Sequence, residues 1–331
     1  GQLAAPVRPP PTGVAMEAVA PPASPSGSWR RPALLVPVLV LAGAILAAYS
    51  NTFDVPFLLD DTASISENPS IRRLWPPGAI VAPPAQAGVG GRPVANLTFA
   101  LNYGAGGLSV RGYHVVNLAI HLGAALLLFG LVRRTLAQPR GPASARAIGA
   151  TPRQIGFGTA LLWALHPLQT EAVTYLSQRT ETLMGCFYLA TLYCLARSAQ
   201  SPRRGWAVLG LITGLAGMAT KEVMVTVPVL ALLYDRTFIS GSFRAAWQAR
   251  RRFHLALLAT WILLVFLLAD VHERGIGHAA VAWWEYALTS TRAISVYLRL
   301  AFWPAPLVFD YGTDVARRVT EVWPHLLLLT A

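Results

Sequence analysis

Charged side chains are scarce in this sequence of 331 residues. They make up 13% of the chain, against about 25% in soluble domains. Apolar residues reach 54%, and the mean hydropathy is +0.47. This composition argues against a water-soluble globular protein and indicates an integral membrane protein.

The motifs of common soluble chemistry are also missing. The sequence has no Walker motif, no GxGxxG fingerprint and no GxSxG elbow, which argues against nucleotide chemistry of the soluble kind. The two cysteines, Cys186 and Cys194, lie eight residues apart in one apolar segment. On a helix this separation is about 12 Å, which is beyond disulfide reach, so the cysteines indicate no redox compartment.

Lysine is nearly absent, since Lys221 is the single lysine beside 26 arginines. A compact ammonium binds an oxyanion as a point charge, whereas arginine binds it as a planar fork. The retained lysine therefore suggests a role that arginine cannot fill. The alternative is a lysine that snorkels or forms an ion pair, with Glu222 as the neighbouring partner.

Apolar runs alternate with polar segments along most of the chain. Residues 1–28 are rich in Ala, Pro and Ser, and we expect a disordered cytoplasmic tail there, followed by a transmembrane domain over residues 29–331. The chain stops within an apolar run, so the domain is expected to be incomplete at its C-terminal end. The expected spans are about Pro32–Tyr49, His114–Val132, Ile155–Leu176, Leu183–Ala196, Trp206–Ala219, Val223–Tyr234, Phe253–Ala269 and a start near Trp323.

The charges between these spans are distributed unequally. With the N-terminus inside, the inner segments hold 16 arginines and two acidic residues, whereas the outer segments hold 11 basic and 13 acidic residues. This is the positive-inside pattern of membrane proteins. It accounts for the net charge of +12 as an orientation signal, and nucleic acid is not expected as a partner.

The segment Trp206–Tyr234 is too short for two full spans and has arginines near both ends. The simplest solution is a hairpin whose tip, "MATKEV", stops below the outer surface. Charged residues at that depth in a membrane are tolerated where they face a protein-lined or water-filled cavity. The hairpin therefore predicts that Lys221 and Glu222 face a pocket.

Two adjacent carboxylates, Asp60 and Asp61, follow the first span in "FLLDDTASISENPSIR". Neighbouring residues point in different directions on a helix or a strand, so the two carboxylates suit two roles, one as a general base and one as a binding residue. The alternative is a solvated pair at a helix start, with Asp61 or Thr62 near the N-cap. Spacing does not separate the two candidates for the base, and we favour Asp60.

The third span carries the block "LHPLQTEAVTYLSQRTETL". Pro167 suits the first turn of a new helix, so we expect a break at His166. Glu171 and Tyr175 would then share one helix face. A metal site of His166 and Glu171 has no supporting Cys/His cluster, and a structural histidine is the stronger interpretation.

The outer stretch from His272 to Arg318 has helical spacing, with Arg292 and Arg299 seven residues apart on one face. It resembles a helix that lies in the outer membrane interface. Its arginines would either bind a lipid phosphate or extend to head groups.

Four ordered blocks carry a resemblance to a known family: "FLLDDTASISENPSIR", "GRPVANLTFALNYGAGGLSVRGYHVVNLAIH", "ALHPLQTEAVTYLSQRTETL" and "GMATKEV". They resemble the transmembrane and tetratricopeptide-repeat protein O-mannosyltransferases and their bacterial relatives, which belong to the GT-C superfamily of polytopic glycosyltransferases. The resemblance covers roughly residues 47–234, and "YLRLAFWPAPLVFDYG" extends it towards Gly312. It implies an all-α membrane bundle with helical outer loops.

The resemblance also implies the chemistry. A polyprenyl-phosphate sugar would be the donor, with mannose as the expected sugar, and a hydroxyl of a protein Ser or Thr would be the acceptor, on the non-cytoplasmic face. Asp60 or Asp61 would act as base, while no cofactor is required and a need for a divalent metal stays open. The residues expected to line the substrate site are Arg92, His166, Glu171, Arg179, Lys221, Glu222, Arg292 and Arg299.

Two other functions stay open at this stage. One is a GT-C transferase that acts on a lipid or a cell-surface glycan, and the other is a lipid or sugar transporter. Soluble tetratricopeptide repeats beyond the present chain would favour the protein transferase. The Ala- and Arg-rich usage suggests a GC-rich genome, hence a bacterial inner membrane with the active site facing the periplasm.

Overall fold

The computed structural model describes residues 1, 32–84, 86–138, 140, 149–269, 281–312 and 314–330. The chain divides into residues 1–36 and a compact unit of residues 37–331. The tail predicted over residues 1–28 lies outside the described residues, apart from Gly1. Helix α1 (Pro32–Ala48) begins in the first part and continues into the compact unit.

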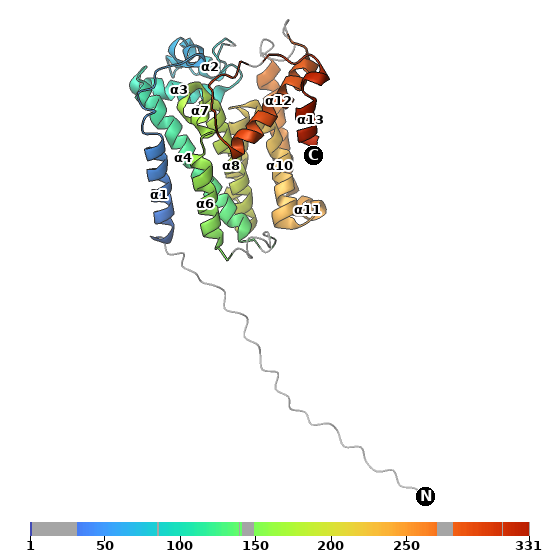
Figure 1. Cartoon of the computed structure of the whole chain (residues 1–331). Coiled ribbons are helices and arrows are strands. Elements are labelled where there is room, and N and C mark those ends of the chain that lie inside the picture. Colours follow the sequence, from blue (N-terminus) through green and yellow to red (C-terminus); the bar gives the residue numbers. More distant parts are fainter. Residues whose placement is uncertain are drawn as a thin grey trace. The chain divides into compact units, whose positions relative to one another are not determined.

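All regular secondary structure in the described residues is helical, which confirms the predicted all-α class (Figure 1). After α1 the elements are η1 Thr62–Ser66, η2 Pro69–Ile71, α2 Gly78–Val81, α3 Pro93–Gly106, α4 Val110–Leu136, α6 Pro152–Leu165, α7 Gln169–Thr174, η3 Leu176–Gln178, α8 Arg179–Gln200, α9 Gly205–Met218, η4 Glu222–Thr226, α10 Val227–Tyr234, η5 Asp235–Ser240, α11 Phe243–Ala269, α12 Trp283–Phe302, η6 Val319–Glu321 and α13 Trp323–Thr330.

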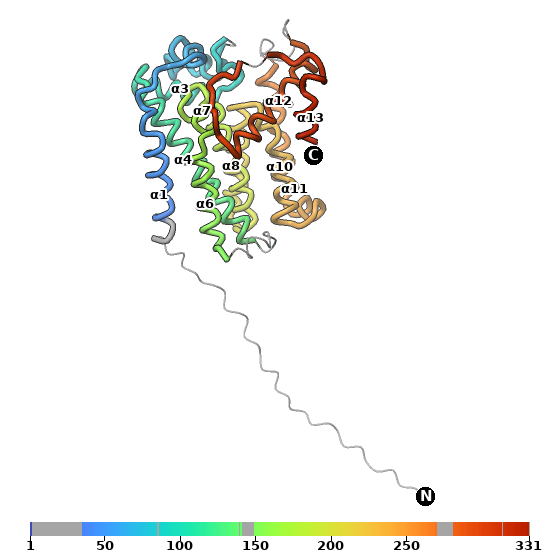
Figure 2. Tube along the Cα trace, viewed as in Figure 1, coloured from blue at the N-terminus to red at the C-terminus, as the bar shows by residue number. Residues whose placement is uncertain are grey.

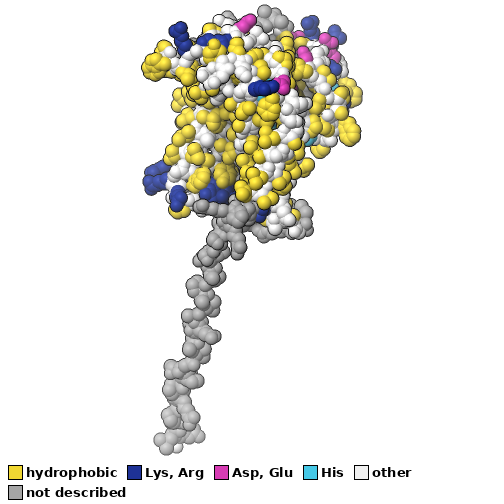
Figure 3. All heavy atoms as spheres, turned by 90° about the vertical axis from the view of Figure 1, so that its left-hand side faces the viewer, with side chains coloured by type: hydrophobic (Ala, Val, Ile, Leu, Met, Phe, Trp, Pro, Cys, Tyr) yellow, Lys and Arg dark blue, Asp and Glu magenta, His cyan; other side chains and the backbone are white. Residues whose placement is uncertain are grey.

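The compact unit is a bundle of long, roughly parallel helices with shorter elements gathered at one end (Figures 1 and 2). Three stretches of the described residues are long and apolar enough to cross a membrane: Val110–Leu136, Glu222–Ser240 and Phe243–Ala269. Figure 3 shows hydrophobic side chains over the middle of one face, basic side chains below them, and basic and acidic side chains above. The chain is a membrane protein, as its composition predicts.

Small residues let the long helices approach one another closely. A Cβ atom at Gly214 of α9 would lie 2.6 Å from the Leu257 Cδ1 atom of α11. A Cβ atom at Gly156 of α6 would lie 3.1 Å from both the Phe129 carbonyl oxygen and the Arg133 nitrogen of α4. Because lipid tails are as apolar as the helix surfaces, such close van der Waals packing drives the association of membrane helices.

Two predicted interruptions of the helices are confirmed. Helix α6 ends at Leu165, and α7 begins at Gln169 after His166 and Pro167. The chain also reverses its direction between α9 and α10. Helix α9 ends at Met218, and Lys221 lies in the turn, directly before the short helix η4. This turn lies at the end of the bundle where α2, α3 and α7 gather (Figure 1).

The predicted bounds of other segments need correction. The arginine-rich stretch Asp235–Arg252 lies between two of the expected spans and is nevertheless helical, because η5 and the first turns of α11 cover it. Helix α8 runs over Arg179–Gln200 and is longer than the predicted span Leu183–Ala196. The predicted spans end where charged residues begin. Arginine and alanine are helix formers of about the same strength as leucine, so a helix can continue past the end of an apolar run.

The start of α8 is fixed by the side chain of Arg179, which is fully buried. Its guanidinium donates to the side-chain oxygens of Asn117 (2.6 Å) and Asn102 (2.7 Å) and to the carbonyls of Tyr113 (3.0 Å) and Thr98 (3.2 Å). The same group lies 4.5 Å above the ring of Phe99. A planar group with five donors satisfies this set of acceptors, and Arg179 thereby ties α3 and α4 to α8.

We expect Arg179→Met to lower the thermal stability of the protein markedly. The substitution leaves the amide oxygens of Asn102 and Asn117 buried without their donor, at a cost of about 1–3 kcal/mol for each orphaned group. Arg179→Lys restores a charge but not the planar fork, so it should recover only part of the loss. The measurement is the melting temperature of the purified protein in detergent, with Arg73→Met, an exposed arginine, as the control. Wild-type melting of Arg179→Met would show that this network contributes little.

Candidate functional site

A polar cavity of about 180 Å³ opens at the end of the bundle that carries α2, α3 and α7. It collects residues from four segments that are distant in the sequence. Its lining consists of Asp60, Ser64, Gly88, Arg92, Ser177, Gln178, Thr180 and Lys221. Asp60 of the acidic pair, the first arginine of the α3 block and the single lysine thus meet in one place.

Helix ends bring these groups together. Asp60 lies just before η1, Arg92 is the residue that precedes α3, and Lys221 is the residue that precedes η4. Ser177 and Gln178 belong to η3, immediately before α8. Because these helix ends bring two cations, Arg92 and Lys221, to one cavity, the cavity favours a negatively charged group such as a phosphate.

The structure separates the two adjacent aspartates. Asp61 is buried, and its carboxylate accepts hydrogen bonds from the backbone N–H of Ser177 (2.6 Å) and of Leu58 (3.0 Å). Burial raises the pKa of the Asp61 carboxyl, and the two backbone donors oppose that rise. Asp60 is exposed and lines the cavity. Asp61 therefore anchors the loop to η3, while Asp60 is the carboxylate available to a ligand.

The backbone of Asp60 is held as well. Its N–H donates to the hydroxyl oxygen of Tyr175, at 2.8 Å. Asp60 and Tyr175 come from segments 115 residues apart. With the two bonds of Asp61, this contact fixes the turn that presents Asp60 to the cavity.

The cations of the site are each paired with a carboxylate. The ammonium of Lys221 contacts Glu181, and Nη2 of Arg92 lies 3.1 Å from Glu222 Oε1. Lys221 therefore pairs with Glu181 in the first turn of α8. The alternative of an ion pair between Lys221 and Glu222 is wrong. An ammonium has three donors and a guanidinium five, so these contacts orient the cations without using their full capacity.

Gly88 forms the wall beside Ser64. Its φ of +63° is in the left-handed region, and a Cβ atom there would lie 2.2 Å from Ser64 Oγ. Any larger residue would therefore strain the backbone and push the serine hydroxyl aside. The glycine keeps this side of the polar cavity open.

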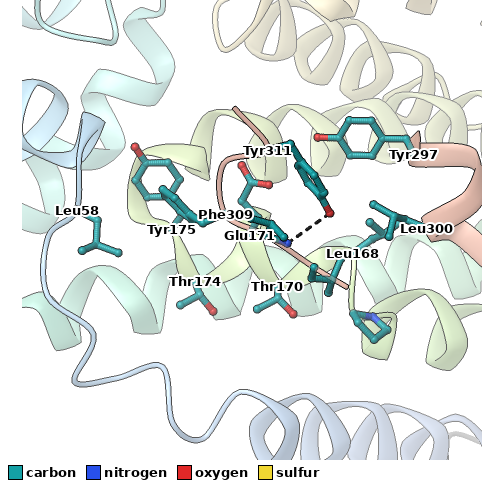
Figure 4. Close-up of a pocket in the computed structure, with 13 residues that line it drawn as sticks. Leu58, Leu168, Thr170, Glu171, Thr174, Tyr175, Tyr297, Leu300, Phe309 and Tyr311 are labelled. Atoms are coloured by element: carbon teal, nitrogen blue, oxygen red, sulfur yellow. Dashed lines mark hydrogen bonds between the residues drawn. The ribbon is translucent and has the colours of Figure 1, made fainter. Parts of the chain in front are cut away.

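A second, apolar cavity of about 270 Å³ lies on the other side of Tyr175. Figure 4 shows Leu168, the residue before α7, Glu171 of α7, Tyr297 and Leu300 of α12, and the aromatic rings of the segment that follows α12. The ring of Phe309 in that segment meets the ring of Tyr175, which lies between α7 and η3, edge to face with 5.1 Å between ring centres. Tyr175 thus lies between the two cavities, with its hydroxyl towards Asp60 and its ring in the apolar one.

The predicted site residues divide into three groups. Arg92 and Lys221 line the polar cavity with Asp60, and Glu222 reaches it through Arg92. Glu171 lines the apolar cavity.

The other predicted residues lie elsewhere. His166 bridges two segments, because its Nδ1 accepts from the Leu168 N–H (3.2 Å) while its Nε2 lies 3.2 Å from the Ala301 carbonyl. Arg179 is in the core between α3, α4 and α8. Arg292 and Arg299 are exposed on α12 and do not belong to either cavity.

No cluster of three or more His, Cys, Asp or Glu side chains able to hold a metal ion occurs in the part of the chain that the structure describes. The groups of the polar cavity are instead a carboxylate, two cations, hydroxyls and an amide. Hydroxyl and amide groups pair with sugar hydroxyls, and the cations suit an oxyanion.

Comparison with known proteins gives one consistent group of relatives. The chain is 28% identical to the fruit-fly protein O-mannosyl-transferase Tmtc1, over 86% of this chain and 35% of that protein. Its relatives are protein O-mannosyltransferases. It is also 29% identical to the fruit-fly Tmtc2, over 83% of this chain and 30% of the relative, and 26% identical to human TMTC4, over 65% and 31%.

These matches confirm the resemblance expected from the four sequence blocks. The chain spans about a third of the length of the mannosyltransferases that it matches. No protein-family model matches the chain, and no solved structure does so.

Several lining residues were not predicted from the sequence. Ser177, Gln178 and Thr180 flank Arg179 in the block that resembles the mannosyltransferases, and that block was the signal that could have identified them. Gly88 lies in the glycine cluster "GVGG", which marks a tight backbone. Ser64 lies in the block "FLLDDTASISENPSIR", which also carries the resemblance, and that block was the signal that could have identified it.

Proposed function

We propose that this chain is the membrane part of a glycosyltransferase that moves mannose from a polyprenyl-phosphate donor to a Ser or Thr hydroxyl of a protein. The observation that carries the proposal is the meeting of Asp60, Arg92 and Lys221 in one polar cavity, in a chain whose relatives are named protein O-mannosyltransferases. The proposed setting is a bacterial inner membrane with the cavity on the periplasmic side. The arginine-rich segments at the opposite end of the bundle support this orientation.

Asp60 is the proposed general base. Its carboxylate removes the proton of the acceptor hydroxyl while the oxygen attacks C1 of the sugar, and the C1 configuration inverts because the attack comes from the face opposite the phosphate. Its exposure in the cavity gives an acceptor access, and the Tyr175 hydroxyl and the bonds of Asp61 hold its backbone in place. Positioning of this kind is what general-base catalysis requires.

The leaving group is the polyprenyl phosphate. When the C1–O bond breaks, the phosphate gains one negative charge, and Lys221 and Arg92 are the cations in the cavity that can stabilise it. Fixed charges aimed at developing negative charge supply a large part of the rate enhancement of many enzymes. The pairs with Glu181 and Glu222 orient these cations before the donor binds.

The apolar cavity would take the first isoprene units of the donor. It is lined mainly by Leu, Val, Phe and Tyr side chains, and one of these, Tyr175, accepts a hydrogen bond from the Asp60 N–H. A donor with an anionic head and an apolar chain needs two such compartments side by side. This arrangement supports a lipid-linked sugar over a water-soluble donor.

The decisive experiment is transfer of labelled mannose from polyprenyl-phosphate-mannose by the purified full-length protein, with a Ser/Thr-containing peptide and membrane extract as acceptors. We expect label in the peptide or in protein. Label in lipid or glycan alone would move the proposal to a GT-C transferase with another acceptor. Donor binding without any transfer, together with donor movement across vesicle membranes, would support a transporter.

Tyr175→Phe should lower kcat about tenfold and leave the KM for the donor nearly unchanged. The substitution removes the hydroxyl that accepts from the Asp60 N–H but keeps the ring that lines the apolar cavity. A small shift of the base can cost a large factor in rate. Steady-state kinetics at varied donor concentration would measure this, with Tyr297→Phe, which lines the same cavity, as the matched control. A change in KM alone would assign Tyr175 to donor binding instead.

A further inference from the structure

The first turns of α11 form a separate short segment at the arginine-rich end of the bundle. The backbone leaves helical geometry at Arg250, where φ is −138° and ψ is 26°. The preceding part of α11 lies across the direction of the long helices at the lower end of the bundle (Figures 1 and 2). The break thus turns the segment from a membrane-crossing direction to one that follows the end of the bundle.

Buried contacts hold this break in place. Asp235 is fully buried. Its carboxylate accepts hydrogen bonds from the Arg250 guanidinium (3.2 Å) and the Ser240 hydroxyl (2.7 Å), and it lies 2.9 Å from His254 Nε2. Arg250 is therefore turned inward, and the acidic residue of this region is engaged with it. The Asp235 carboxylate pairs with Arg250 and His254, and not with the nearby Arg244, Arg251 or Arg252.

The faces of the segment differ in chemistry. Ala246 is buried against the bundle, while Phe243 and Trp247, four residues apart, are 51% and 44% exposed. Arg244, next to Phe243, is exposed, and Arg251 and Arg252 are exposed beyond the break. Two large aromatic side chains and three cations therefore face outward on one short stretch.

We infer that this surface, formed by Phe243, Arg244, Trp247, Arg251 and Arg252, binds the head groups of anionic phospholipids in the leaflet at that end of the bundle. The three arginines match the phosphates in charge, and a guanidinium binds phosphate through paired donors. Aromatic side chains are stable at the level of the head groups.

The surface is continuous with the part of α11 that would face the lipid chains. Past the break, Leu258, Ile262 and Val265 of α11 are 42%, 75% and 69% exposed, within a stretch apolar enough to cross a membrane. A basic amphipathic segment at the end of such a span lies where the acyl chains meet the head groups. The inference does not depend on the proposed sugar transfer.

Anionic-lipid binding can be measured directly on the purified full-length protein. Phosphatidylglycerol or phosphatidylcholine would be titrated into the detergent-solubilised protein, and bound lipid counted by native mass spectrometry. We expect a preference for phosphatidylglycerol that falls about fivefold for each arginine replaced in Arg244→Gln, Arg251→Gln and Arg252→Gln. The matched control is the triple variant Arg73→Gln, Arg317→Gln, Arg318→Gln, whose arginines are exposed outside α11. Equal phosphatidylglycerol binding in both triple variants would overturn the inference.

A second measurement leaves the arginines untouched, so that it stands if the triple variant fails to fold. The protein would be placed in phosphatidylcholine–phosphatidylglycerol vesicles with bromine at different depths of the acyl chains. The quenching lost on Trp247→Phe reports the depth of Trp247. We expect the strongest quenching from bromine near the head groups. Absence of quenching at Trp247 would place the segment in water and contradict the inference.

Discussion

Replacing Asp60 by Asn lowers mannose transfer by about 10²–10⁴-fold, the usual range for the loss of a general base, while thermal stability stays at the wild-type value. Asp60 is exposed in the polar cavity, and its bond to Tyr175 is made by its backbone N–H rather than by its carboxylate. The amide of Asn is nearly the same size and cannot take up the acceptor proton. The rate should therefore fall without a loss of folded protein.

Asp61→Asn is the matched control and should show the opposite pattern. Both carboxylate oxygens of Asp61 accept from backbone N–H groups, and an Asn side chain offers only one acceptor. Its NH₂ group would face one of those donors. The melting temperature should fall, and activity should fall with it because the loop that carries Asp60 loosens.

The two variants can be distinguished by measuring the melting temperature and the rate in the same detergent. Full activity of Asp60→Asn would exclude Asp60 as the base. A folded, stable Asp61→Asn protein without activity would move the base to Asp61. Loss of activity in both variants with unchanged melting would show that both carboxylates act on the substrate.

The choice between these aspartates shows what the sequence could predict of the site and what it could not. The motif "FLLDD" predicts a functional acidic pair, but spacing treats the two residues alike. The distinction comes from the Ser177 N–H, which is 116 residues from Asp61 along the chain. A contact of that separation depends on how η3 packs against the first outer segment, and local patterns carry no information on it.

Lys221 and Arg179 illustrate the same limit. The break at His166 and the turn at Lys221 follow from local signals, namely a proline and a short apolar segment, and both are present in the structure. The partner of Lys221 is Glu181 rather than the adjacent Glu222. In the sequence, Arg179 cannot be distinguished from other arginines of the membrane segments. Its buried hydrogen-bond acceptors come from α3 and α4, so this residue stabilises the core although it lies within a site motif.

Lys221→Met should lower the rate of transfer by about 10²–10³-fold, the range for removal of one electrostatic stabiliser of a transition state. The ammonium lies in the polar cavity with Asp60. The phosphate gains charge as the C1–O bond breaks, so the loss should be greater in kcat than in donor affinity. Lys221→Arg keeps the charge but spreads it over a planar fork, and we expect it to recover part of the rate.

Glu181→Gln is the control for the ion pair, because it removes the carboxylate that contacts Lys221 and leaves the ammonium in place. If Lys221 acts on the leaving phosphate, Glu181→Gln should keep most of the activity, since orientation is weakened while the charge is retained. If Lys221 serves only to pair with Glu181, both substitutions should have similar, small effects on the rate and similar effects on melting. Transfer kinetics of Lys221→Met, Lys221→Arg and Glu181→Gln, beside their melting temperatures, therefore separate a cation that stabilises developing charge from one that stabilises the fold.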